Sequence, residues 1–173
     1  MRSSDESKIE AWASAIGSDR FMSRYRPHSN TALCRIIQQE DQDIGYLWIE
    51  KEAKESREGV LGILIGEERC WSKGIGRKAI DLIIAEAMEI LGIHSVVLRV
   101  RSDNTRAYQC YIASGFITTE HGQKLSPTGE VIHFMTMQRK LPIGWRAGGD
   151  GGIALRLPVG HPGPAEPEPG RSS

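Results

Sequence analysis

Long apolar runs are missing from this sequence, and so is any net charge. No stretch approaches the ~20 apolar residues that a membrane-spanning helix needs, and residues 1–6 hold no apolar segment of the kind found in signal peptides. Lysine and arginine together number 22, as do aspartate and glutamate. Because a nucleic-acid-binding protein normally carries a basic face, we expect neither a membrane nor a nucleic acid as a partner.

Cysteine is scarce as well: the chain holds three, at Cys34, Cys70 and Cys110. This is an odd number, and the spacings match no metal-binding motif. We therefore expect three reduced thiols without a chemical role in a cytoplasmic protein, and no metal.

The apolar residues that are present make up 39% of the 173 residues, enough for one domain with a core. Residues 1–141 are predicted to form that domain. Beyond them the composition changes, because 142–173 holds six of the eight prolines and a run of glycines at 148–152. Such a composition is typical of a disordered tail, although Trp145 and the apolar residues of 153–157 offer a means of docking.

Hydrophobic periodicity predicts an α/β domain of three helices and six strands. Ser3 and Glu6 form a candidate capping box for the first helix, whose apolar face precedes Gly17. The strand–helix–strand order in the middle implies a parallel pair, while the flanking hairpins imply antiparallel strands, so the sheet is mixed. The predicted helices are 4–16, 74–91 and 105–114, and the predicted strands are 31–38, 44–49, 60–65, 95–100, 116–119 and 131–139.

Residues 19–30 separate the first helix from the first strand and are rich in basic side chains: Arg20, Arg24, Arg26 and His28. They form either a solvated basic loop or one wall of an acceptor cleft.

A glycine-rich stretch joins the third predicted strand to the second helix. The apolar run ends at Gly66, and the helix begins at Gly74-Ile75-Gly76. Glycines permit close approach of the backbone, and the N-terminus of a helix offers unpaired N–H groups to an anion. The stretch is therefore either a pyrophosphate site supported by Lys73, Arg77 and Lys78 or a plain loop-to-helix turn.

Two other phosphate motifs fit this stretch poorly. A P-loop requires glycine five residues after Gly66, where the sequence has Trp71. Residues 74–79 match the relaxed dinucleotide fingerprint, but eight residues separate the strand from its first glycine, and no acidic residue ends the next strand to hold a ribose.

A second motif lies about thirty residues further on: Asn104-x-x-Ala107-x-x-x-Tyr111-x-x-x-Gly115-Phe116. Together with residues 72–77 it closely resembles the GNAT superfamily of N-acetyltransferases over roughly residues 5–140. The first half is most similar to ribosomal-protein alanine and serine N-acetyltransferases. Residues 122–137 are also similar to aminoglycoside 6′-N-acetyltransferases.

The resemblance implies a mixed sheet whose two central parallel strands splay apart to admit acetyl-CoA. The pantetheine arm would pair with the third strand, the pyrophosphate would lie on the N–H groups of the glycine loop, and Asn104 would reach the pantetheine. Tyr111 would stand near the sulfur as general acid. The implied cofactor-binding residues are Ile63, Leu64, Ile65, Ser72, Lys73, Gly74, Ile75, Gly76, Arg77 and Asn104. A structural reading remains open for two residues, with Asn104 as an N-cap and Tyr111 as a core aromatic.

The sequence departs from the family at two places. Trp71 stands where the family often has glutamine or arginine, and we assign it no role. Relatives carry a catalytic acid at the position of Arg99, or on the preceding strand near Val60 or Leu64, and this chain has neither. The general base is therefore unassigned, with a water chain, Glu67, Glu68 and His133 as candidates.

The predicted function is the transfer of an acetyl group from acetyl-CoA to a primary amine, either a small molecule or a protein N-terminus, by a monomer or homodimer. A non-catalytic acyl-CoA-binding module of the same fold is the first alternative. An aminoglycoside-type 6′-N-acetyltransferase is the second, and the missing acid near Leu64 argues against it. An unrelated α/β nucleotide-binding protein is the third.

Overall fold

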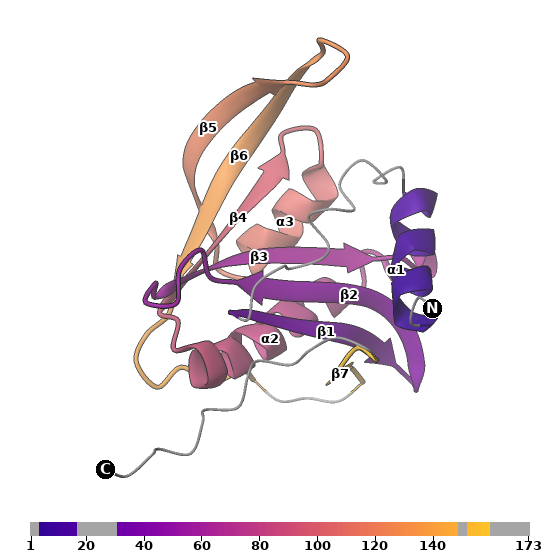
Figure 1. Ribbon diagram of the computed structural model, residues 1–173, viewed down its shortest axis with the longest axis vertical. Coiled ribbons are helices and arrows are strands. Elements are labelled where there is room, and N and C mark those ends of the chain that lie inside the picture. Colours follow the sequence, from indigo (N-terminus) through magenta and orange to yellow (C-terminus); the bar gives the residue numbers. More distant parts are fainter. Residues whose placement is uncertain (1–3, 17–30, 149–151, 160–173) are drawn as a thin grey trace, which may run out of the picture.

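The computed structural model describes residues 4–16, 31–148 and 152–159, and these form one mixed α/β domain (Figure 1). The predicted order of helices and strands is confirmed, with one strand added at the end. The elements are α1 (Ser4–Ala15), β1 (Ala32–Gln39), β2 (Gln42–Glu50), β3 (Glu58–Ile65), the 3-10 helix η2 (Glu68–Cys70), α2 (Ile75–Leu91), β4 (Ser95–Arg101), α3 (Thr105–Ala113), β5 (Ile117–Leu125), β6 (Val131–Lys140) and β7 (Ala154–Arg156).

The strands form one seven-stranded sheet in the order β5-β6-β4-β3-β2-β1-β7. Helices cover both faces of it, so the alternating side chains of the inner strands are buried on both sides. On β1, Leu33 and Ile37 pack with α2, whereas Cys34 and Ile36 pack with α1. Within the described ranges, no helix is long and apolar enough to cross a membrane.

The two central strands, β3 and β4, are parallel but pair over only three residues each. Residues 58–60 of β3 lie beside residues 95–97 of β4, and there the pairing ends. Beyond this point β3 continues along β2 as far as Ile65, while β4 continues along β6 as far as Arg101. Figure 1 shows the two strands diverging. The predicted mixed sheet with splayed parallel strands is therefore confirmed.

The strand predicted at 116–119 is longer in the structure, where β5 runs from Ile117 to Leu125. It is the edge strand and pairs only with β6, so most of its side chains are exposed and no apolar alternation marks its second half. Ser3 of the predicted capping box and the basic loop at 19–30 lie outside the described residues.

The predicted disordered tail needs one correction, because Ala154–Arg156 forms β7. This strand pairs antiparallel with β1, which would otherwise be the second edge of the sheet. Leu155 packs against the main core, and so does Trp145 earlier in the same segment. The proline and glycine content of the segment concealed this docking, which depends on contacts with residues far away in the sequence.

An ion-pair network fixes β7 to the start of the chain. Arg156 donates two hydrogen bonds to Asp5, at 2.8 and 2.9 Å, and its Nε donates to Asp43 at 2.9 Å. Asp5 is buried and also accepts from the Val159 N–H at 2.6 Å. The hydrogen bonds from Arg156 hold the pKa of Asp5 and of Asp43 below the usual carboxyl range.

We predict that Arg156→Met lowers the free energy of unfolding at pH 7 by about 2–4 kcal/mol, because it leaves the buried Asp5 carboxylate without its cationic partner. Since folding lowers both carboxyl pKa values, their contribution is present above about pH 4 and is lost as the pH falls through the folded values. The difference between parent and variant in urea denaturation should therefore shrink below about pH 4. Arg101→Met, which breaks an exposed pair with Asp103, is the control and should change stability by less than about 0.5 kcal/mol. Equal stability of the parent and the Arg156 variant would contradict the assigned role.

Candidate functional site

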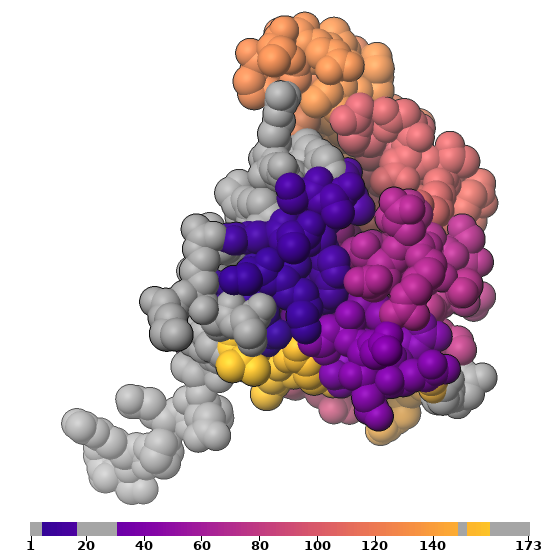
Figure 2. Space-filling model, turned by 90° about the vertical axis from the view of Figure 1, so that its right-hand side faces the viewer, coloured from indigo at the N-terminus to yellow at the C-terminus, as the bar shows by residue number. Residues whose placement is uncertain are grey.

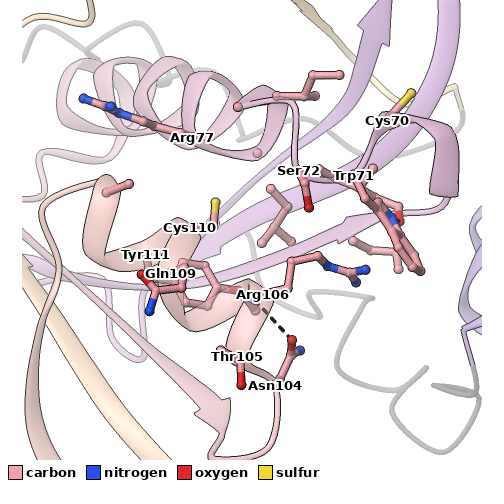
Figure 3. A pocket seen from close by; sticks show the side chains of 18 of the residues that line it. Cys70, Trp71, Ser72, Arg77, Asn104, Thr105, Arg106, Gln109, Cys110 and Tyr111 are labelled. Atoms are coloured by element: carbon pink, nitrogen blue, oxygen red, sulfur yellow. Dashed lines mark hydrogen bonds between the residues drawn. The ribbon is translucent and has the colours of Figure 1, made fainter.

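A pocket of about 680 Å³ opens where β3 ends, between the start of α2 and the exposed side of α3 (Figure 3). It brings together ten of the eleven residues that the sequence predicts for the site. The lining residues in this set are Ile63, Leu64, Ile65, Ser72, Gly74, Ile75, Gly76, Arg77, Asn104 and Tyr111. Lys73 does not line the pocket, although its neighbours on both sides do.

The N-terminus of α2 faces this pocket without a side-chain cap. Gly74 is its N-cap residue and has φ 76°, a left-handed conformation that glycine adopts at no steric cost. Gly74 supplies no side-chain cap, and the N–H groups of Ile75, Gly76 and Arg77 have no carbonyl partner within the helix. The loop and helix therefore present backbone donors and the positive end of a helix dipole to the cavity.

Gly76 has a different reason to be glycine. A Cβ atom at this position would lie 3.1 Å from the Cys110 Sγ and 3.4 Å from a methyl group of Ile65. The missing side chain allows α3 and β3 to approach the first turn of α2. Gly74 is thus needed for its left-handed backbone conformation, and Gly76 is needed because a side chain would clash with neighbouring elements.

The glycines of β3 and its end make room for tryptophans. A Cβ atom on Gly62 would lie 2.0 Å from the ring of Trp48, and one on Gly66 would lie 2.0 Å from the ring of Trp12. The Trp12 indole also donates to Glu67 at 3.3 Å. The contacts of Trp12 hold α1 against the end of β3, and the close approach of the backbone at both glycines is to a tryptophan of this chain.

Asn104 and Tyr111 come from the same face of α3. Asn104 precedes the helix, and its Oδ1 accepts from the Ala107 N–H at 3.1 Å, which confirms it as the N-cap. Ala107 and Tyr111 follow at spacings of three and seven residues, which places all three on one side of the helix facing the pocket. Tyr111 is half-buried and packs edge-on against Phe116, with ring centroids 6.0 Å apart.

Trp71 and Arg106 also line the pocket, and sequence reasoning did not place either. The Trp71 indole N–H donates to the Ile65 carbonyl at 2.9 Å, close to where β3 ends. The Arg106 guanidinium lies 3.5 Å from the centroid of the Trp71 ring. The two residues are 35 positions apart and belong to different elements, so no local pattern in the sequence links them.

The candidate general bases lie elsewhere. Glu67 is engaged by Trp12 and lies 3.7 Å from Arg69, and neither Glu68 nor His133 lines the pocket. Among the described residues, the lining contains no carboxylate. Nor do residues 4–16, 31–148 and 152–159 hold a cluster of His, Cys, Asp or Glu suited to a metal ion.

The three cysteines are free thiols, as predicted. Burial raises the pKa of Cys34 to about 11 and also raises the pKa of Cys110, which lines the pocket. A thiol with a raised pKa is a poor nucleophile at neutral pH because little thiolate is present. Neither cysteine is therefore suited to nucleophilic catalysis.

Comparison with known proteins places the chain in a family. The family model of the acetyltransferase (GNAT) domain matches residues 2–117, which is more than half of the chain. No curated protein matches the sequence.

Several solved structures share the fold. One is the dodecameric spermidine N-acetyltransferase from Vibrio cholerae, with TM-score 0.64 and 17% identity over 81% of this chain and 90% of that one. Another is the N-acetyltransferase PseH from Campylobacter jejuni, with TM-score 0.57 and 17% identity over 81% and 92%. A third is a GNAT-family acetyltransferase from Streptococcus pneumoniae, with TM-score 0.56 and 20% identity over 72% and 75%. From the family match and the splayed sheet, we conclude that the chain belongs to the GNAT family of acetyltransferases.

Proposed function

We propose that the protein transfers the acetyl group of acetyl-CoA to a primary amine, with Tyr111 as general acid. One observation carries the proposal: a single pocket joins the gap beside β3, the uncapped start of α2 and the side chain of Tyr111. Each feature alone has a structural explanation, but together they supply a slot, an anion site and a proton donor.

The residues of the pocket suit acetyl-CoA. Residues 72–77 offer backbone N–H groups to the pyrophosphate, with Arg77 as an additional cation. Lys73, which does not line the pocket, would contribute through its backbone. Ile63, Leu64 and Ile65 lie in the part of β3 from which β4 has diverged. The edge of β3 is unpaired there, and an unpaired strand edge can accept an added extended chain.

Two details refine this arrangement. The Gly66 N–H donates to Ile44 of β2, so Leu64 also turns its backbone groups to β2, while those of Ile63 and Ile65 face the gap. The Ile65 carbonyl already accepts from Trp71, so we expect Ile63 and the Ile65 N–H to provide most of the pairing with the pantetheine arm. The Oδ1 of Asn104 is engaged in capping α3, which leaves its Nδ2 to donate to that arm. Asn104 thus acts as N-cap and ligand at once.

The proposed reaction is attack by the acceptor amine on the thioester carbonyl. A backbone N–H of β3 stabilises the negative charge that develops on the carbonyl oxygen. Tyr111 then donates its proton to the departing sulfur, and the proton that the attacking nitrogen loses passes to water, from which Tyr111 is reprotonated. In water a cysteine-like thiol has a pKa of ~8.5 and a tyrosine hydroxyl one of ~10, close enough for a positioned tyrosine to donate to the sulfur.

A non-catalytic acyl-CoA-binding module is the second candidate. It is favoured by the absence of a carboxylate among the described lining residues, since no side chain is then placed to accept the proton of the amine. Tyr111 in the pocket counts against it. A water chain, or an amine that arrives partly neutral, removes the need for a base.

Two similarities to known enzymes bear on the acceptor class. The sequence resembles ribosomal-protein N-acetyltransferases, which favours a protein N-terminus, while a spermidine N-acetyltransferase among the structural relatives favours a small amine. The lack of an acid near Leu64 argues against an aminoglycoside 6′-N-acetyltransferase. We further propose a cytoplasmic location, on the basis of the three free thiols, and a monomer or homodimer.

The proposal is tested by incubating the purified protein with acetyl-CoA and a panel of primary amines and N-terminal peptides, while free thiol is measured. We expect acetyl-CoA to raise the melting temperature and at least one acceptor to release thiol. A thermal shift without thiol release from any acceptor would favour the non-catalytic module. No thermal shift with either acetyl-CoA or CoA would contradict both candidates.

We predict that Tyr111→Phe lowers kcat/KM by about a hundred- to ten-thousand-fold, because the variant has no proton to donate to the sulfur. The thermal shift with acetyl-CoA should remain. Tyr108→Phe on the same helix is the matched control, since Tyr108 does not line the pocket, and it should leave turnover unchanged. Turnover of the Tyr111 variant at the parent rate would remove the general-acid assignment.

A further inference from the structure

Of the two edges of the seven-stranded sheet, the described part of the chain covers one. At that edge β7 lies along β1 and is fixed by Arg156, whereas β5 at the other edge pairs only with β6. The hairpin of β5 and β6 projects beyond the other strands (Figure 1), and most side chains of β5 are exposed. An open edge strand is a template for pairing with another chain, so β5 is a candidate interaction surface.

Alternate residues of β5 direct their backbone N–H and C=O groups away from β6. Where the hairpin turns, the Ser126 N–H donates to the Glu130 carbonyl at 2.7 Å, so Ser126 faces β6. The register between the two strands is regular from Glu120 onward, and the direction of the backbone groups alternates from one residue to the next. The even-numbered residues of this segment therefore face β6. The residues whose backbone groups face outward are His121, Gln123 and Leu125.

A second copy of β5 can pair with this edge in only a few registers. Two identical strands related by a two-fold axis run antiparallel, and outward-facing residues must lie opposite outward-facing residues. When the axis passes through Gly122, Glu120 of one copy lies opposite Lys124 of the other, and the pair occurs twice. An axis through His121 or Gln123 would place both charges opposite uncharged residues.

The register centred on Gly122 also suits the side chains. Glu120, Gly122 and Lys124 lie on one face of the strand, and opposite charges directly across a strand pair stabilise it. These positions form non-hydrogen-bonded pairs, in which side chains approach most closely. Phe134 of β6 covers Gly122, since a Cβ atom there would lie 2.5 Å from the Phe134 ring. The two Phe134 rings therefore lie on either side of the axis and give the centre of the interface an apolar cover.

We propose that the protein forms a homodimer in which β5 of one copy pairs antiparallel with β5 of the other about Gly122. The two sheets then become one continuous sheet. His121 of each copy exchanges backbone hydrogen bonds with Gln123 of the other, and two pairs of Glu120 with Lys124 flank the axis. The charges fix the register and disfavour pairing with an unrelated edge strand. This inference goes beyond the proposed acetyl transfer and does not depend on it.

The test measures the oligomeric state by sedimentation velocity over a wide range of protein concentration. Glu120→Lys and Lys124→Glu each place like charges opposite one another at two positions of the interface. The double variant, E120K with K124E, exchanges the charges and keeps them complementary. An equimolar mixture of the two single variants also restores complementary pairs, because one variant carries only lysine at the two positions and the other only glutamate.

Two kinds of control accompany these variants. Lys54→Glu and Glu55→Lys change the net charge by the same amounts, but they lie in the exposed loop between β2 and β3. His121→Pro tests the backbone pairing, because it removes an N–H that faces away from β6. An edge strand tolerates proline at such a position, so the hairpin should remain folded. Circular dichroism and the melting temperature report whether each variant is folded.

We expect the parent to dimerise. Each single reversal should raise the Kd of the dimer by at least about tenfold, because every substitution acts at two places in the interface. The double variant and the mixture should return close to the parent value. His121→Pro should abolish dimerisation, and the two loop controls should match the parent.

Three results would overturn the proposal. A parent that stays monomeric at every concentration would leave this edge to a strand from another protein. A dimer that withstands both single reversals would place the interface elsewhere on the molecule. Folded single variants that fail to associate when mixed would contradict the register about Gly122. Each result would leave the acetyltransferase function intact, because thiol release tests that function separately.

Discussion

Beyond Val60 and Val97, the two central parallel strands stop pairing, and the candidate site depends on this separation. Each strand is held from its outer side: β3 by β2 and β4 by β6, both to the end of the strand. The gap is therefore built into the sheet and does not require a loop to open. Trp12 of α1 packs on Gly66, where β3 ends, and Figure 2 shows α1 at the surface on this side of the molecule, so this helix supports the strand beside the gap.

Three tryptophans fix the end of β3. Trp48 lies over Gly62, Trp12 lies over Gly66, and Trp71 binds the Ile65 carbonyl. Buried aromatic rings contribute a large apolar area with few rotatable bonds, so they hold the strand and the loop that leads to α2 in one position. Because the loop is held in this position, its unpaired N–H groups stay directed at the pocket and do not turn to other acceptors within the chain.

Local patterns in the sequence predicted most of the elements. In α2 and β3, for example, the spacing of the apolar residues along the sequence already indicates the type of element and which side chains are buried. The motif from Asn104 to Tyr111 was informative for a similar reason, since its spacing matches one face of a helix. The docking of β7 and the stack of Arg106 on Trp71 could not be predicted, because each joins segments that are distant in the sequence. Nor could the sequence predict that Gly62 and Gly66 make room for tryptophan rings, because Trp48 and Trp12 come from other elements.

Amide hydrogen exchange tests most directly the central claim that the gap beside β3 and the start of α2 together hold an acyl-CoA. Exchange at each backbone N–H is measured with and without saturating CoA, which is not turned over. We predict new protection at Ile63, at Ile65 and at the first turn of α2, because bound ligand groups would accept from these donors, whereas the Leu64 N–H faces β2. Protection confined to other elements, or none at a CoA concentration that raises the melting temperature, would contradict it.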